Sequence, residues 1–243
     1  MAGVKKKGKG RSKPVFRLRF GRFLFDLVIC FLALTLVPVL VYRVLPPPTT
    51  PLMWLRWMEK GRPDEFPLMI KEWKRLDDIS PSLFRAVIAA EDQKFFIHNG
   101  FDWDAVESAV KTNLTTNRTV GASTITMQTA RNVFLWQDRS WLRKSLEAYF
   151  TFLIETFWRK DRILEMYLNI IEWGDGIFGC EAAARTYFNH SSNRLTPVES
   201  AWMATILPNP RIWSVYKPEN LEDRQARILQ AMPRVRLLAA QKS

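Results

Sequence analysis

Residues 23–42 form an apolar run that decides how the whole chain can be laid out. The run reads FLFDLVICFLALTLVPVLVY and holds one charged side chain, Asp26. A helix of this length rises about 30 Å, the thickness of the hydrocarbon layer of a bilayer, and a proline such as Pro38 is tolerated in it. Arg43 and three prolines follow, where a secretory signal would have a small-residue cleavage site. The sequence therefore predicts an uncleaved membrane anchor, against the alternative of a buried core helix.

Basic residues precede the apolar run and set its expected orientation. Residues 1–22 contain nine lysines and arginines and no acidic residue, so the rest of the chain carries only +3 of the formal net charge of +12. Because positive residues remain on the cytoplasmic side of a membrane, we expect the amino terminus in the cytoplasm and everything after Arg43 outside it. A domain at +3 without a basic stripe argues against nucleic acid as a partner.

The segment between the anchor and residue 80 divides into a linker and an apolar stretch. Residues 46–51, PPPTTP, predict a stiff extended linker that holds the following domain close to the bilayer. Residues 52–58 either lie at the headgroup level, with their tryptophans at the interface, or pack on the domain. The predicted organisation is a basic tail (1–22), a transmembrane helix (23–43), a linker and membrane-proximal segment (44–79) and one domain (80–243).

The predicted domain is mainly α-helical. Helical spacing of apolar residues recurs from residue 80 onward, and no alternation of period two runs longer than four or five residues. The two cysteines, Cys30 and Cys180, predict no intramolecular disulfide, because one of them lies inside the anchor. Two histidines, His98 and His190, without a nearby cysteine predict no closed zinc site.

One carboxylate lies where a solvated helix face would not place it. The Ser-Pro pair at 80–81 predicts a helix start, and apolar residues then recur at helical spacing from Phe84 to Phe95. Glu91 lies on this apolar stripe, whereas Asp92 points about 100° away. Glu91 is either a buried carboxylate paired with an arginine or a general acid or base whose pKa is raised by apolar walls. The following turn, typical of a cleft edge, favours the second reading and contains Phe95, Phe96, His98, Gly100 and Asp102.

Residues 111–132 predict a polar hinge that leads into a helix. Hydroxyls of Ser123, Thr124 and Thr126 can cap this helix, whose free N–H groups would form an anion site. Arg118 before the start and Arg131 after it add positive charge. The alternative is a mobile linker without a ligand.

Residues 140–158 predict an amphipathic helix that carries a second carboxylate, Glu147. It follows Arg143 by four residues and Lys144 by three. The group is either an ordinary surface ion pair, worth about 0.3 kcal/mol, or a site for a pyrophosphate or its metal ion. Residues 160–174 predict a strongly apolar helix ending at Gly174, which we interpret as scaffold.

Five strings, in this order and spacing, resemble the peptidoglycan glycosyltransferases, glycosyltransferase family 51. They are EDQKFFIHNGFD (91–102), GASTITMQTARN (121–132), RKSLE (143–147), KDRILEMYLNIIEWG (160–174) and GIFGCEAAARTYF (176–188). The resemblance implies a lysozyme-like, two-lobed helical domain that polymerises lipid II by base-assisted inverting transfer and releases undecaprenyl pyrophosphate. Because only 33 residues follow Pro210, without SDN or KTG motifs, we expect the monofunctional form that lacks a transpeptidase domain.

The resemblance also implies roles for single residues. Glu91 would take the proton from the 4-hydroxyl of the acceptor sugar, and Glu147 would help to hold the donor pyrophosphate, directly or through a divalent cation, magnesium or manganese. No organic cofactor is implied. The residues that would neutralise the pyrophosphate are Arg118, Arg131, Arg143 and Lys144; those lining the donor site are Ser123, Thr124, Gln128 and Asn132. The predicted substrate-binding set also includes Asp92, Phe95, His98, Gly100 and Gly121.

The sequence departs from the family pattern at two positions. Met127 stands where the family usually has a first glutamine, and Arg131 where it usually has lysine. The second change keeps the charge but alters its geometry. The first removes a polar group from the expected site.

Partners and alternatives follow from the same resemblance. We expect lipid II, the growing glycan strand and the membrane as partners, together with other cell-wall or division enzymes, and a periplasmic domain at the bacterial inner membrane. A membrane-bound lytic transglycosylase and a non-catalytic cell-wall scaffold are the alternatives.

Overall fold

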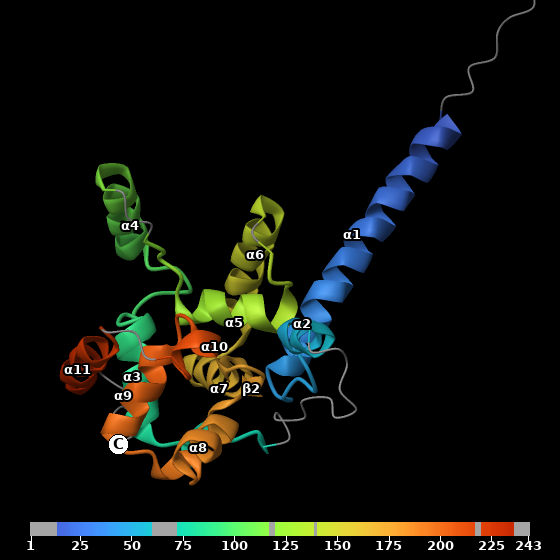
Figure 1. Ribbon diagram of the computed structural model, residues 1–243. Helices are drawn as coiled ribbons and strands as arrows, with labels where there is room; N and C mark the ends of the chain where they lie inside the picture. Colours follow the sequence, from blue (N-terminus) through green and yellow to red (C-terminus); the bar gives the residue numbers. More distant parts are fainter. Residues whose placement is uncertain (1–13, 60–71, 117–119, 139, 217–219, 236–243) are drawn as a thin grey trace, which may run out of the picture.

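The computed structural model describes residues 14–59, 72–116, 120–138, 140–216 and 220–235 (Figure 1). Within these ranges the chain is helical apart from one two-stranded sheet, which confirms the predicted class. The longer helices are α1 (Pro14–Tyr42), α2 (Pro51–Glu59), α3 (Pro81–Glu91), α4 (Trp103–Thr115), α5 (Ile125–Phe134), α6 (Trp141–Phe157), α7 (Lys160–Ile170), α8 (Cys180–Phe188), α9 (Pro197–Ile206) and α11 (Leu221–Ala231). The shorter elements are η2 (Leu76–Asp78), β1 (Glu172–Gly174), β2 (Ile177–Phe178), η3 (Ser192–Arg194), α10 (Pro210–Trp213) and η4 (Met232–Arg234).

Helix α1 contains the predicted membrane anchor. Its segment Gly21–Tyr42 is long and apolar enough to cross a bilayer. The helix begins at Pro14, earlier than the predicted start of the span at residue 23, and Pro38 is accommodated inside it. Large apolar side chains from Phe23 to Leu34 are exposed, as expected for a surface that contacts lipid rather than protein.

The last turns of α1 are docked on the helical body that follows it in the chain. The hydroxyls of Thr35 and Tyr149 lie 2.9 Å apart, and the Trp158 indole donates to the Val39 carbonyl at 2.7 Å. Val39 is fully buried, unlike the exposed residues nearer the start of the helix. The Arg162 guanidinium also donates to the carbonyls of Tyr42, the last residue of α1, and of Leu45. The anchor and the domain therefore share a packed interface.

Helix α2 packs one face on the domain. Leu52 and Met53 are buried against Phe178, and the Arg56 guanidinium donates to Glu172 at 2.9 Å. Trp54, on the same helix, remains partly exposed. Residues 52–58 were predicted either to lie at the lipid headgroups or to pack on the domain. The helix face that carries Leu52 and Met53 packs on the domain.

Helix α7 lies at the centre of the body, with α5 against it and α3 packed on α9 and α11 (Figure 1). Its side chains Ile163, Leu164, Leu168 and Ile170 are at most 1% exposed. A second group, α4 and α6, projects from the body on the same side as α1 (Figure 1). This arrangement fits the predicted lysozyme-like, two-lobed domain.

The predicted end of the helix at 160–174 is wrong. Helix α7 stops at Ile170, and residues 172–174 form strand β1, which pairs antiparallel with β2. A Cβ at Gly174 would lie 2.1 Å from the Tyr187 hydroxyl, so this strand passes too close to α8 for a side chain. In residues 172–174, pairing between β1 and β2 therefore outweighs the helical spacing of the apolar residues.

Helix α3 starts where predicted but ends sooner. Ser80 caps it by accepting from the Ser82 N–H at 3.3 Å. The predicted apolar stripe continues to Phe95, yet the helix ends at Glu91 with Asp92 as its C-cap. Phe95 is nevertheless fully buried, because the turn after the helix folds back onto the core.

Candidate active site

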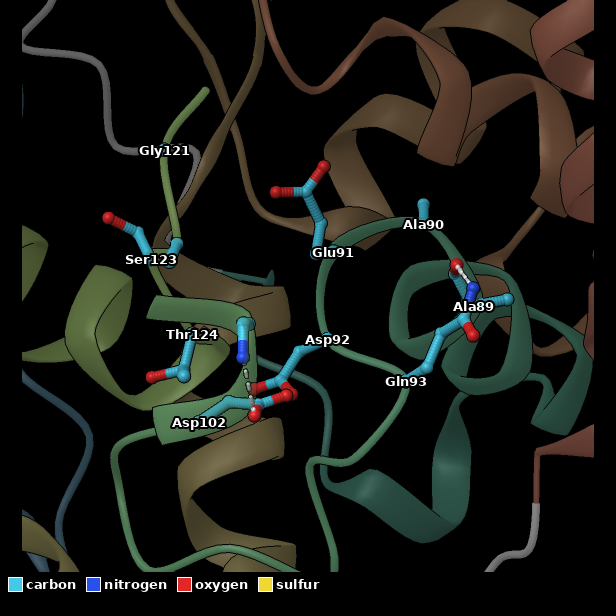
Figure 2. A pocket seen from close by; sticks show the side chains of 11 residues that line it. Ala89, Ala90, Glu91, Asp92, Gln93, Asp102, Gly121, Ser123 and Thr124 are labelled. Atoms are coloured by element: carbon cyan, nitrogen blue, oxygen red, sulfur yellow. Dashed lines mark hydrogen bonds between the residues drawn. The ribbon is translucent and has the colours of Figure 1, made fainter. Parts of the chain in front are cut away.

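A pocket of about 240 Å³ opens between the end of α3 and the segment that leads into α5. Figure 2 shows the Glu91 side chain standing clear of α3, with its carboxylate on the side of Gly121 and Ser123. The pocket unites two motifs that are separated by helix α4 in the chain. Five predicted site residues line it: Glu91, Asp92, Gly121, Ser123 and Thr124.

The Glu91 carboxylate is held from two sides. Its side chain is only 15% exposed. The Gln128 amide donates to Oε2 at 2.9 Å, and the Arg224 guanidinium lies 3.5 Å from Oε1. The expected arginine partner is therefore present, Glu91 also borders an open pocket, and its role as a general acid or base stays a prediction. Arg224 comes from α11, and no motif in the sequence indicated it.

Tyr167 extends this group into the core. Its hydroxyl donates to the Gln128 Oε1 at 3.1 Å, and its side chain is 1% exposed. Burial, followed by the negative charge of Glu91, raises the pKa of Tyr167 well above its ordinary value. The phenol therefore stays protonated. Helix α7 was interpreted as scaffold, so this contact with the site is an addition to the sequence-based reading.

Asp92 uses both of its oxygens inside the protein. The His98 Nε2 lies 2.8 Å from Oδ1 and 3.0 Å from Oδ2, and the Ile125 N–H donates to Oδ2 at 3.0 Å. The Asp92 side chain is 2% exposed and that of His98 8%. The side chain turns away from Glu91, toward Thr124 (Figure 2), as predicted. This carboxylate therefore joins the end of α3 to the start of α5.

Thr124 joins the loop at Gly100 to the start of α5. It is the N-cap of α5, accepting from the Met127 N–H at 3.1 Å and donating to the Gly100 carbonyl at 2.7 Å. Gly100 has φ +87°, and a Cβ there would lie 2.8 Å from the Thr151 side chain on α6. Met127 is buried and does not line the pocket. Thr124, the predicted cap, thus lies at a closely packed corner formed by the start of α5, the loop at Gly100 and α6.

Phe95 lies beneath this corner. Its ring is fully buried, and the Lys160 ammonium lies over the ring, 4.6 Å from its centroid, in a cation–π contact. Lys160 and Thr126 each donate to the Glu155 carboxylate at 2.6 Å. Substrate contact by Phe95 stays a prediction; in the structure its side chain supports the loop.

The RKSLE motif forms a buried ion cluster on α6. Glu147 is 1% exposed, with Arg143 on one oxygen and Lys144 on the other. The Arg143 side chain is 11% exposed and that of Lys144 42%, so the lysine faces solvent. An ordinary solvated surface pair is therefore excluded for Glu147.

The remaining predicted residues lie on α5 or outside the described part of the chain. Asn132 accepts from the Gln137 amide at 3.2 Å. The Nε of Arg131 is buried, with no hydrogen-bond partner among the described residues. The prediction for Arg118 falls outside the described residues.

A divalent cation does not fit a site made of protein ligands around Glu147. Both carboxylate oxygens already accept from Arg143 and Lys144. In the described ranges, no three His, Cys, Asp or Glu side chains are grouped so that they could hold a metal ion. The metal stays a prediction, and no step proposed below goes through it.

A helical body on a helix long and apolar enough to cross a membrane, with carboxylates at its pocket and a buried glutamate paired with two cations, fits the lysozyme-like class of glycan-processing proteins. A model of the Transglycosylase family matches residues 68–233, more than half of the chain. The chain therefore belongs to this family.

Individual relatives agree. Over 209 residues the chain is 49% identical to a biosynthetic peptidoglycan transglycosylase of Bdellovibrio bacteriovorus, covering 86% of this chain and 84% of that protein. A protein of the same name from Caulobacter vibrioides is 50% identical over 195 residues, or 80% of this chain and 82% of its own length. A third protein of this name, from Rhodospirillum centenum, is 50% identical over 211 residues, which cover 86% of this chain and 89% of that protein.

Proposed function

We propose that this protein is a peptidoglycan glycosyltransferase that polymerises lipid II into glycan strands and releases undecaprenyl pyrophosphate. Family membership and the names of its relatives support the reaction class. The observation that carries the proposal is Glu91, a carboxylate that borders an open pocket and is oriented by Gln128 and Arg224. The name "biosynthetic" in the relatives favours polymerisation over the lytic alternative.

Two adjacent carboxylates border the pocket, and their contacts distinguish their roles. Asp92 has both oxygens hydrogen-bonded, to His98 and to the Ile125 N–H, and its side chain is only 2% exposed, so a substrate hydroxyl has less access to it than to Glu91. Glu91 has one close hydrogen bond, at Oε2, and a looser contact at Oε1. Glu91 therefore acts as the general base that takes the proton from the 4-hydroxyl of the acceptor sugar. The oxygen of that hydroxyl attacks the anomeric carbon of the donor with inversion.

The leaving pyrophosphate needs fixed positive charge. Arg143 and Lys144 are held by Glu147, which orients them. Arg131, at the end of α5, adds a guanidinium whose Nε has no protein partner in the described residues. Cations placed before the reaction stabilise charge that develops on the leaving group. The predicted donor site then lies along α5 and α6.

The substrate is attached to lipid, and the molecule is built to meet it at a membrane. Helices α4 and α6 project on the same side as α1 (Figure 1) and expose Trp103, Leu114, Trp141 and Leu142. Such side chains contact lipid more favourably than water. We propose a single-pass protein with its amino terminus in the cytoplasm and its domain in the periplasm. Contact with other cell-wall or division enzymes stays a prediction.

The test is polymer formation from labelled lipid II by purified full-length protein. Glu91→Gln should lower the rate by about 10²-fold or more, because it removes a general base while conserving shape. The control is Glu222→Gln, an exposed carboxylate at the start of α11, which should polymerise at the wild-type rate. Normal polymerisation by Glu91→Gln would refute the proposed mechanism. Products released from finished sacculi, without polymer from lipid II, would instead establish the lytic alternative.

A further inference from the structure

We infer that Tyr167 is a positioning residue for Glu91 that acts through the side-chain amide of Gln128. The Tyr167 hydroxyl lies 3.1 Å from the Gln128 Oε1, and the Gln128 Nε2 lies 2.9 Å from the Glu91 Oε2. These two hydrogen bonds connect the central helix α7 to the pocket through α5. This inference rests on the proposed role of Glu91 as general base.

The chemistry of the three groups allows one assignment of donors and acceptors. An ionised carboxylate only accepts, so the Gln128 Nε2 must face Glu91. The Gln128 Oε1 then faces Tyr167 and also only accepts, so the phenol must donate. The phenol and the carboxylate therefore favour the same orientation of the amide, each from one side. Without the phenol, only the carboxylate would hold the amide in place.

The position of Tyr167 makes it a rigid support. Its ring is part of the core and 1% exposed, between fully packed neighbours on α7. The charged groups that act on its hydroxyl are Glu91, Arg131 and Asp92. Burial and the two carboxylates keep the hydroxyl protonated, and only a protonated hydroxyl can donate.

The consequence is a choice between the two oxygens of Glu91. The hydrogen bond from Gln128 engages Oε2, whereas Oε1 has only the longer contact of 3.5 Å with Arg224. Oε1 is then the oxygen that accepts the proton of the acceptor hydroxyl. Loss of the phenol would leave Gln128 free to rotate, so that the carboxylate would sample other rotamers. A reactive group displaced by about 1 Å loses much of its rate.

The experiment compares two tyrosine variants in lipid II polymerisation. Tyr167→Phe removes only the hydroxyl, and we expect kcat to fall about 2- to 13-fold, the worth of one hydrogen bond, with KM unchanged. Tyr187→Phe is the matched control, because its hydroxyl donates to the Trp173 carbonyl at 3.0 Å, away from Glu91. It should retain the wild-type kcat. A merely structural loss would reduce the two variants alike.

A double variant gives the second measurement. If Tyr167 acts through Gln128, then Tyr167→Phe should cause no further loss of kcat in a Gln128→Leu background. Independent, additive losses would overturn the inference, as would a wild-type kcat for Tyr167→Phe. If Tyr167→Phe fails to fold, Gln128→Leu alone decides, because an unchanged kcat there refutes the relay. Full activity of Glu91→Gln would mean that the proposed function fails; an inactive Glu91→Gln beside a fully active Tyr167→Phe would refute the positioning role alone.

Discussion

Replacing Asp92 by asparagine should loosen the connection between α3 and α5. In the wild type its oxygens accept from the Ile125 N–H and the His98 Nε2. Asparagine offers one carbonyl oxygen, which can keep the Ile125 N–H, and an NH₂ group, which then faces the His98 Nε2. The Nε2 can accept from this NH₂ group only when the ring proton is on Nδ1, a buried atom without a hydrogen-bond partner among the described residues. Either tautomer therefore leaves one N–H donor of His98 unpaired, beside an Asp92 side chain that is 2% exposed in the wild type.

The cost follows from that unpaired donor. A buried donor without a partner destabilises a protein by about 1–3 kcal/mol. For a domain of this size, each kcal/mol lowers the melting temperature by about 2–4 °C. We therefore expect Asp92→Asn to melt about 2–12 °C below the wild type. Because α5 also carries Gln128, polymerisation should slow as well.

The assay is thermal unfolding of full-length protein in one detergent, followed by circular dichroism. The matched control is Asp104→Asn, since Asp104 pairs with Lys94 at 2.6 Å but its side chain is 82% exposed. An exposed ion pair contributes little, so this variant should melt close to the wild type. Equal melting temperatures for Asp92→Asn and wild type would refute the reasoning.

Two further predictions concern other carboxylates. Glu147→Gln should lower polymerisation by roughly 10²-fold, because Arg143 and Lys144 lose the group that orients them; a wild-type rate with lipid II would contradict this. Burial alone would raise the pKa of Glu181, but hydrogen bonds from Ser192 and Ser191 outweigh it and hold the pKa below its ordinary value of 4.5. The stabilisation is thus present above about pH 4.5 and is lost as the pH falls through the lower folded-state pKa. In urea unfolding, the advantage of wild type over Glu181→Gln should shrink on acidification, and a constant gap would contradict the assignment.

The starts of the helices could be predicted because their signals are local. Ser80, Thr124 and Ser140 each cap a helix within a few residues of the expected position. A hydroxyl that accepts from an N–H two or three residues later needs no tertiary partner. The membrane-spanning run was equally visible, because its length and composition suffice.

The ends of the helices depended on distant partners. Helix α3 stops at Glu91 because Asp92 reaches α5, and the chain after Ile170 pairs as a strand with residues beyond Gly174. Neither contact has a signature at the residue concerned. The spacing of apolar residues therefore predicted which segments are helical, but not the residues at which the helices end.

The site was predicted by residue type and only partly by geometry. The motifs identified Glu91 and Glu147, but Arg224 approaches Glu91 from α11, which lies outside the five matched strings. Tyr167 was visible only as one more apolar position of a core helix. Such contributions arise from packing between helices that are far apart in the chain.

The docking of α1 has a consequence for how the protein works. Thr35, Val39 and the carbonyl of Tyr42 attach the last turns of α1 to Tyr149 on α6, to the C-cap Trp158 and to Arg162 on α7. These contacts fix the position of the body, and of its pocket, relative to the anchor helix. A substrate in the bilayer would therefore have to diffuse to the pocket, because the described part of the chain leaves the body no free linker on which to reach for it.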